Sequence, residues 1–331
     1  MLIPFQSIIG QEKAKHLLAI SFQRQKMSHA YLFRGPAGVG KKTCAQAFAA
    51  LINCAAPGND EVCGHCPSCL KFHSGNFPDL LQLELQGTAS SIKIDQIREL
   101  KKLLTYPPFE ASFRVVLITD IHITMRRKEV TNSLLKILEE PPANTLFILT
   151  GDEAGDILPT ILSRCQIISF YPLPYERVAQ ALMREKIDQD TAITLSAIAE
   201  GSLGRARLLY QEELLPLRRE IIENLLSLAP DHPDTVESVF RLAEKAAGMK
   251  DNLEELLDLL TIWLRDVMLA HKGLSARVIS SDLRACLPEA CRKWDFPVLA
   301  EKLQRIDRAR RQLLHNCNRT LVCEVLFFEL L

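Results

Sequence analysis

The chain has 331 residues, a length that suits two or three domains better than one. Hydrophobic residues make up 47% and charged residues 24%, as in a soluble protein with a full core. Lys+Arg and Asp+Glu number 40 each, and this zero net charge argues against a protein that holds DNA through its whole surface, while a local basic patch stays possible.

Targeting signals are the next feature that the sequence can exclude. The N-terminal segment MLIPFQSIIG has no basic stretch leading into a long apolar run, so we expect no signal peptide. No apolar stretch reaches the roughly 18 residues of a membrane span. The expected location is therefore the cytoplasm, where the ten cysteines would be reduced.

In the first half of the chain, strand-like and helix-like segments alternate. Helices are expected from about Lys41 to Asn53, around Ile94 to Leu104, and around Leu134 to Leu138, where Pro141-Pro142 ends the helix. The expected strands are Ala30–Phe33, Leu80–Glu84, Phe113–Thr119, Thr145–Thr150 and Gln166–Phe170. This alternation predicts an α/β domain with a parallel sheet that helices cover on both faces.

After Tyr171-Pro172-Leu173-Pro174 the strand signals end and helical periodicity takes over. The run Leu253, Leu256, Leu257, Leu260 and Leu264 is typical of a buried helix face. The predicted organisation is an α/β domain over residues 1–170, a small helical lid domain over 171–210, and an all-helical C-terminal domain over 211–331.

A phosphate-binding loop is indicated by Gly35-Pro-Ala-Gly-Val-Gly40-Lys41, which follows a strand and opens a helix. Such a loop directs backbone N–H groups and a helix N-terminus at phosphate, and Lys41 would reach the β- and γ-phosphates. The candidate nucleotide-binding residues are Gly35, Gly38, Gly40, Lys41, Lys42 and Thr43. The alternative is a glycine-rich turn without a ligand.

The positions that should hold Mg²⁺ depart from a working ATP site. The residue after the loop lysine should be Ser or Thr, but it is Lys42, and Thr43 lies one residue late, about 100° further around the helix. The next strand should end in Asp-Glu, but Thr119-Asp120 stands there. The loop could still bind ATP or ADP, but we expect hydrolysis to be slight or absent.

Four cysteines form a second constellation, with the spacing C-x8-C-x2-C-x2-C over residues 54–69. Four thiolates this close suit tetrahedral Zn²⁺. The insert between them has few apolar residues to form a core, so a bound metal ion would be needed to hold its structure. The candidate metal ligands are Cys54, Cys63, Cys66 and Cys69. His65 and His73 are possible substitutes, free thiols in a loop are the alternative, and the absence of a carboxylate inside the cluster predicts a structural metal.

Four segments occur together in a characteristic order: GPAGVGKKT, the cysteine insert, LLKILEEPP (Leu134–Pro142) and LPTILSRC (Leu158–Cys165). In this combination the chain resembles the bacterial clamp-loader subunits of DNA polymerase III, AAA+ proteins of the tau/gamma and delta-prime kinds. The resemblance covers roughly residues 5 to 210 and rests further on the helical C-terminal region and its ending, Asn318 to Leu326. It implies a RecA-like AAA+ domain, the lid, and a C-terminal collar domain for oligomerisation.

The resemblance also implies residue roles. Arg164, in Ser163-Arg164-Cys165, resembles an arginine finger that acts on the ATP of a neighbouring subunit. In the lid segment, an active tau/gamma chain has a nucleotide-sensing arginine where Gly204 stands, and Arg205 is displaced by one residue. By itself, Arg164 could equally be a surface arginine in a loop.

A degraded metal site beside a retained SRC motif favours the delta-prime kind, a stationary subunit within the polymerase holoenzyme. The implied partners are tau/gamma and delta subunits in a heteropentamer, and through that complex the sliding clamp and primer-template DNA. The alternative is an ATP-hydrolysing motor subunit of the tau/gamma kind. A DNA-binding zinc module is a third alternative, which the lack of a basic recognition helix disfavours.

Overall fold

The structure is a computed structural model that describes residues 4–58, 60–85, 92–125, 127–152, 157–228 and 233–331. The chain separates into two compact units, residues 1–173 and residues 174–331. The boundary lies within the Tyr171-Pro172-Leu173-Pro174 segment, where the sequence pattern changes from mixed to helical. Each unit is described separately below.

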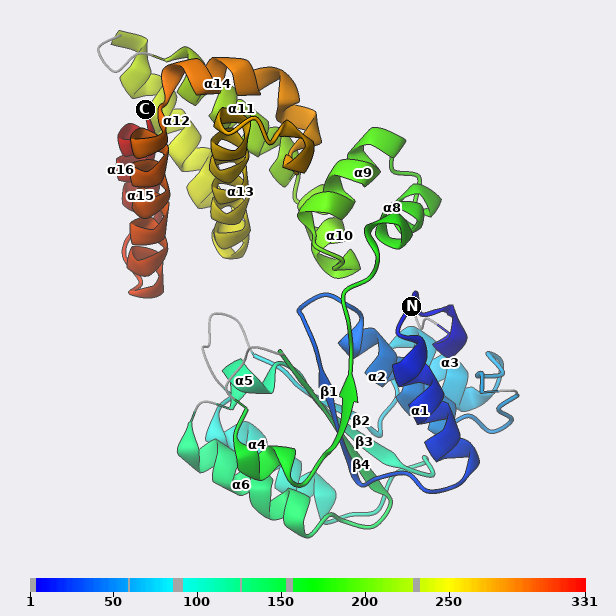
Figure 1. The fold of residues 1–331 in the computed structure, drawn as a ribbon. Coiled ribbons are helices and arrows are strands. Elements are labelled where there is room, and N and C mark those ends of the chain that lie inside the picture. The colour runs from blue at the N-terminus through cyan, green and yellow to red at the C-terminus, as the bar shows by residue number, and fades with distance from the viewer. Residues whose placement is uncertain (1–3, 59, 86–91, 126, 153–156, 229–232) are drawn as a thin grey trace. The chain divides into compact units, whose positions relative to one another are not determined.

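The first unit is built on a parallel sheet (Figure 1). Within the described residues, five strands pair in the order β2-β3-β4-β1-β5. Their bounds are β1 Ala30–Arg34, β2 Leu80–Leu83, β3 Arg114–Ile118, β4 Thr145–Gly151 and β5 Gln166–Ser169. All neighbouring pairs run parallel, so the carboxyl ends of the strands meet at one edge. This confirms the expected α/β class and every expected strand.

Helices cover both faces of this sheet, with α1, α2 and α3 on one side and α4, α5 and α6 on the other (Figure 1). Successive residues of β3 serve opposite faces, because side chains alternate along a strand. Val115 and Leu117 belong to one buried cluster, and Val116 and Ile118 to the other. The helices are α1 Glu12–Gln23, α2 Lys41–Ile52, α3 Pro67–Ser74, α4 Ile94–Leu104, α5 Ile121–Thr124, α6 Lys128–Glu139 and α7 Pro159–Leu162, with a 3-10 turn at Phe5–Ser7.

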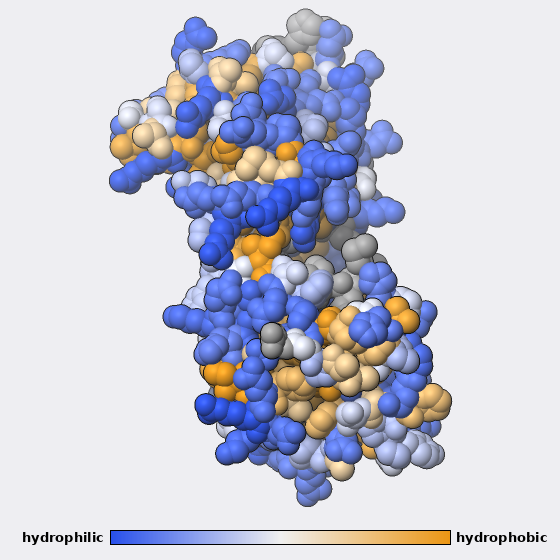
Figure 2. Space-filling view, turned by 90° about the vertical axis from the view of Figure 1, so that its right-hand side faces the viewer, coloured by the Kyte–Doolittle hydropathy of each residue, from blue (hydrophilic) through white to orange (hydrophobic). Residues whose placement is uncertain are grey.

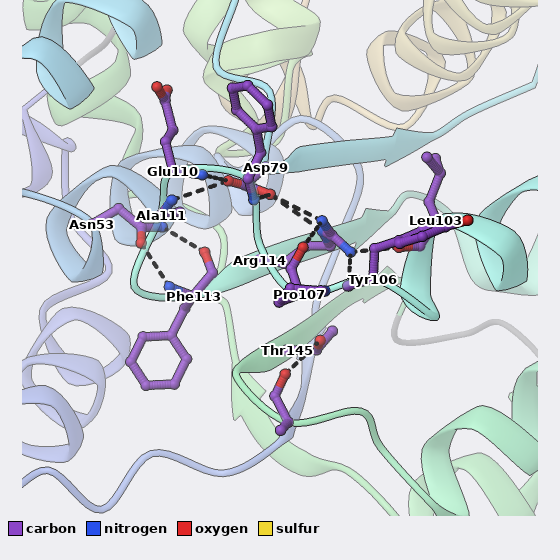
Figure 3. A network of polar contacts seen from close by, with 12 residues as sticks. Asn53, Asp79, Leu103, Tyr106, Pro107, Glu110, Ala111, Phe113, Arg114 and Thr145 are labelled. Atoms are coloured by element: carbon purple, nitrogen blue, oxygen red, sulfur yellow. Dashed lines mark hydrogen bonds and ion pairs between the residues drawn. The ribbon is translucent and has the colours of Figure 1, made fainter.

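A buried ion pair between Asp79 and Arg114 lies at the amino ends of β2 and β3. The carboxylate of Asp79 accepts the backbone N–H groups of Phe109, Glu110 and Ala111 at 2.8–3.0 Å, and the guanidinium of Arg114 at 3.2 Å. Arg114 also donates to the carbonyls of Leu103, Tyr106 and Pro107. Figure 3 shows the two side chains pointing toward one another between the strand and the loop. The segment between α4 and β3 is thereby tied to the sheet at both ends.

The second unit is helical throughout its described residues, as the sequence predicts. Its core contains the predicted leucine face: Leu253, Leu256, Leu257, Leu260 and Leu264 are all buried, as is Trp263 in the same helix. The helices are α8 Tyr175–Arg184, α9 Gln189–Ile198, α10 Leu203–Gln211, α11 Leu214–Ser227, α12 Pro233–Gly248, α13 Leu253–His271, α14 Leu287–Lys293, α15 Phe296–Leu314 and α16 Arg319–Leu330. Short 3-10 segments lie at Lys250–Asn252, Ser275–Arg277 and Ser281–Cys286. The further division of this unit into lid and collar at residue 210 stays a prediction.

One face of the molecule is drawn in Figure 2 with each residue coloured by hydropathy. Figure 2 shows hydrophilic residues over most of the visible face, interrupted by smaller hydrophobic patches. Among the described residues, the structure contains no helix with the length and apolar character needed to cross a membrane.

Candidate functional site

The predicted phosphate loop connects β1 to α2 at the carboxyl edge of the sheet. Gly38 and Gly40 have φ values of 70° and 100°, a region that favours glycine. Gly35 is required for a different reason: a Cβ atom there would lie 2.3 Å from the carbonyl oxygen of Phe170, just beyond β5. The structure therefore brings the expected glycines into one loop at the start of a helix.

Lys41 is folded back onto this loop. Its Nζ donates to the carbonyl oxygens of Gly35 and Pro36 at 2.5 and 2.7 Å, and the residue is only 6% exposed. Burial lowers the pKa of Lys41, and the nearby carboxylates of Asp120 and Asp152 partly oppose this. These contacts use two of the three ammonium donors, so a phosphate could bind the third or replace a carbonyl contact.

Lys42 occupies the position where a metal-binding hydroxyl is expected. Its ammonium lies 2.6 Å from a carboxylate oxygen of Glu84, directly after β2. A cation already paired with a carboxylate disfavours Mg²⁺ at the same place, because the two positive charges repel. Thr43 follows in α2 and is half-buried.

The acidic position beyond β3 is shaped by its backbone rather than by a metal-binding pair. Asp120 has φ 49° and precedes α5, and its N–H donates to the hydroxyl of Thr150 at 3.0 Å. Nearby, the backbone N–H of Asp152 donates to Nδ1 of His122 at 3.3 Å. Thr119, which has no charge, stands where the metal-supporting aspartate is expected.

Arg164 lies two residues beyond α7, and its side chain is 32% exposed. Nη1 donates to the carbonyl oxygen of Thr160 at 3.0 Å and to the hydroxyl of Ser163 at 3.2 Å. Nη2 lies 2.6 Å from a carboxylate oxygen of Glu139, the last residue of α6. The arginine of SRC is thus held by the first glutamate of LEEPP.

Arg205, the displaced candidate for nucleotide sensing, is engaged inside the second unit. It donates from Nε to Glu255 at 2.8 Å and from Nη2 to Asp258 at 3.1 Å, both on α13. Asp258 also pairs with Arg310 of α15 at 2.5 Å. This arginine therefore joins α10 to α13, and Asp258 in turn joins α13 to α15.

The four predicted metal ligands converge. The Sγ atoms of Cys54, Cys63, Cys66 and Cys69 all lie within 4.8 Å of one another. Cys54 follows α2, Cys66 caps α3, and Cys69 lies in its first turn. Nδ1 of His65 donates to the carbonyl oxygen of Cys63 at 2.9 Å, and the cluster found among the described residues contains cysteines only.

The thiol geometry fits a tetrahedral ion. Two of the Sγ–Sγ separations are 3.7 and 4.0 Å, close to the roughly 3.8 Å edge of a tetrahedron with about 2.3 Å metal–sulfur bonds. Backbone N–H groups of Cys63, Cys66 and Cys69 point at sulfur atoms of the cluster at 3.3–3.5 Å, which stabilises thiolate charge. The four cysteines can therefore hold a metal ion.

Four carboxylate partners of these residues were not predicted from the sequence: Glu84, Glu139, Glu255 and Asp258. Each pairs with a candidate residue from a distant segment, so no local spacing marks the contact. Only Glu139 carried a signal, because it belongs to LEEPP, the motif named beside SRC in the resemblance.

Comparison with known proteins gives family matches over both units. Residues 10–174 match the family model described as DNA polymerase III, delta subunit, and residues 212–331 match the model of its C-terminal region. The delta' subunit of DNA polymerase III from Bacillus subtilis (strain 168) is 27% identical over 311 residues, covering 93% of this chain and 92% of the relative.

The tau subunit of the same organism is 33% identical over 199 residues, covering 60% of this chain. The chain spans only 34% of that relative's length. A gamma subunit-related protein of known structure from Thermotoga maritima is 20% identical, with a TM-score of 0.48, over 94% of this chain and 97% of its own. With family models matched over most of its length and a delta' relative aligned nearly end to end, the chain belongs to the delta-prime family of DNA polymerase III clamp-loader subunits.

Proposed function

We propose that the chain is the stationary subunit of a bacterial clamp loader, which uses ATP to load a sliding clamp onto primer-template DNA. Its task is to contribute Arg164 to the ATP site of a neighbouring motor subunit. An arginine placed there stabilises the charge that spreads over the transferred phosphoryl group. The chain itself hydrolyses little or no ATP.

The observation that carries this proposal is the ion pair between Lys42 and Glu84. Phosphoryl transfer depends on a metal ion held beside the loop lysine, and here the residue that should bind it with a hydroxyl is a lysine paired with Glu84. Thr119 removes the second metal support. A chain that lacks the metal supports of an ATP-hydrolysing site but has an accessible Arg164 suits a subunit that completes another chain's site.

The proposed partners follow from the family. They are tau/gamma motor subunits and a delta subunit in a heteropentamer, in the cytoplasm, with the clamp and DNA bound by the assembly. The helical region over residues 211–331 would supply the collar contacts. Zn²⁺ is the proposed occupant of the four-cysteine cluster, because four thiolates at tetrahedral spacing suit it. It would stabilise the insert and take no part in hydrolysis.

The proposal is tested by reconstituting the loader with single variants of this subunit. Arg164→Ala should fold and assemble normally but abolish hydrolysis at the one site that Arg164 faces, where a finger is worth about 10³-fold or more in rate. The total rate should fall less, because other sites keep their own arginines. Lys41→Ala should change the assembled rate little. A severe loss with Lys41→Ala and a normal rate with Arg164→Ala would contradict the proposal.

The alternative is a motor subunit of the tau/gamma kind, which the 33% identity to a tau subunit favours. In that case the intact Gly35-to-Lys41 loop would bind ATP and Mg²⁺, with Lys42 swung away from Glu84. Clear Mg²⁺-dependent hydrolysis by the purified chain would select this alternative.

A further inference from the structure

The contact between Arg164 and Glu139 has a consequence for how the proposed finger works. The 2.6 Å separation joins a guanidinium to a carboxylate, the same kind of partner that a phosphate offers. Because Glu139 already binds Nη2, a phosphate on the neighbouring subunit competes with it for this donor. We infer that Glu139 is a positioning residue, which holds Arg164 until the neighbour's nucleotide takes its place; this inference rests on the function proposed above.

The remaining contacts of Arg164 indicate which part of the side chain stays fixed. Nη1 is bound by the carbonyl of Thr160 and the hydroxyl of Ser163, both from the arginine's own loop. Those neutral acceptors do not repel a phosphate. Among the described residues, only Glu139 places a negative charge on the guanidinium. The exchange therefore consists of replacing one anion on Nη2, while the loop keeps Nη1 oriented.

The position of Glu139 at the end of its helix strengthens its pairing with Arg164. It is the last residue of α6, where the helix dipole is negative and a carboxylate is disfavoured unless a cation is near. Arg164 supplies that cation. When a phosphate replaces the carboxylate on Nη2, Glu139 loses this cation at the helix end, and this cost opposes engagement of the finger. Glu139 thus keeps Arg164 ordered but also lowers its tendency to leave.

Both side chains are accessible, at 32% exposure for Arg164 and 48% for Glu139, so the pair is weak enough to exchange. Replacing Glu139 by Gln removes the competing charge and keeps the size of the side chain. We expect kcat/KM for ATP at the neighbouring site to rise by up to about fivefold, equivalent to the roughly 1 kcal/mol ceiling for exposed ion pairs. Damage to the structure would lower this ratio, so a rise is diagnostic.

The experiment uses the reconstituted loader with wild-type chain, Glu139→Gln, Arg164→Ala and the double variant. The rise should vanish in the Arg164→Ala background, because Glu139 acts only through that arginine. It should also shrink as salt is raised, since screening weakens the pair in the wild type. Glu140→Gln is the matched control, changing the adjacent exposed carboxylate of LEEPP, and should leave the ratio unchanged.

The outcomes separate the inference from the function on which it rests. An unchanged or lowered kcat/KM with Glu139→Gln, while Arg164→Ala still abolishes hydrolysis, overturns the role of Glu139 and leaves the finger standing. The same rise in both backgrounds also overturns it. A normal rate with Arg164→Ala would remove the proposed function itself.

Discussion

The ammonium of Lys42 lies 2.6 Å from the carboxylate of Glu84, so that a residue in the first turn of α2 is joined to the residue that follows β2. Lys42 and Glu84 neutralise each other's charge, whereas in a hydrolysing site a metal ion bound after the loop lysine neutralises phosphate charge. The two side chains are 48% and 41% exposed, so the pair contributes little to stability.

The first prediction is that Lys42→Thr alone does not create an ATPase. The substitution restores the missing hydroxyl and removes the repelling ammonium, but Thr119 still provides no carboxylate for the metal. Phosphate release by the purified chain should stay at background with Mg²⁺ present. The double variant Lys42→Thr/Thr119→Asp should gain Mg²⁺-dependent nucleotide binding. Ordinary turnover from the single change would show that the acidic position is not limiting.

The second prediction concerns the cysteine cluster. Purified under reducing conditions, the chain should contain one Zn²⁺, measured by elemental analysis, and Cys66→Ser should lose it. Loss of the metal should loosen the insert over residues 54–69 more than the whole unit, because the sheet has its own buried clusters. Proteolysis within the insert is the direct measurement. Cys317→Ser, at an exposed cysteine outside the cluster, should retain full metal content.

Features that depend on neighbouring residues could be predicted from the sequence, whereas contacts between distant segments could not. The strands, the loop before α2 and the four cysteines were predictable because each has a local pattern or spacing. Glu84 and Glu139 were not, because they meet Lys42 and Arg164 through the packing of separate elements. Arg205 shows the same limit: its sequence position lies one residue from that of a nucleotide-sensing arginine, and only the packing of α10 against α13 shows that its guanidinium binds carboxylates of α13.

The third prediction is that Asp79→Asn destabilises the first unit by about 3–5 kcal/mol, since it leaves the buried guanidinium of Arg114 without a counter-charge. The side chains are 1% and 8% exposed, so water cannot compensate. Urea unfolding measures the change. Asp95→Asn, which breaks an exposed pair with Arg98, should cost at most about 1 kcal/mol. Equal effects would mean that burial does not decide the strength of the Asp79 pair.

The fourth prediction is the pH dependence of that pair. Burial alone would raise the pKa of Asp79, but three backbone N–H donors and Arg114 bring it below its ordinary value. A carboxyl whose folded pKa is lowered stabilises the fold above its unfolded pKa, about 3.9, and loses this contribution as pH falls through the folded value. The stability difference between wild type and Asp79→Asn should be constant at neutral pH and shrink below about pH 4. A difference that grew on acidification would reverse the sign of this account.

The last prediction separates the structural role of the phosphate loop from any role in binding. A Cβ at position 35 would lie 2.3 Å from the carbonyl oxygen of Phe170 and 2.9 Å from its carbonyl carbon, so the backbone beyond β5 would have to move. Gly35→Ala should therefore lower the stability of the first unit by roughly 1–3 kcal/mol even when no nucleotide is present. Gly248→Ala is the control, because its Cβ meets nothing within 4 Å and the position is helical, so its effect should be neutral or stabilising by up to about 1 kcal/mol. Denaturant midpoints of both variants, measured without nucleotide, decide the matter. If Gly35→Ala unfolds like the wild type but fails to bind nucleotide, the glycine serves phosphate; if it unfolds early, packing against β5 is enough to require glycine there.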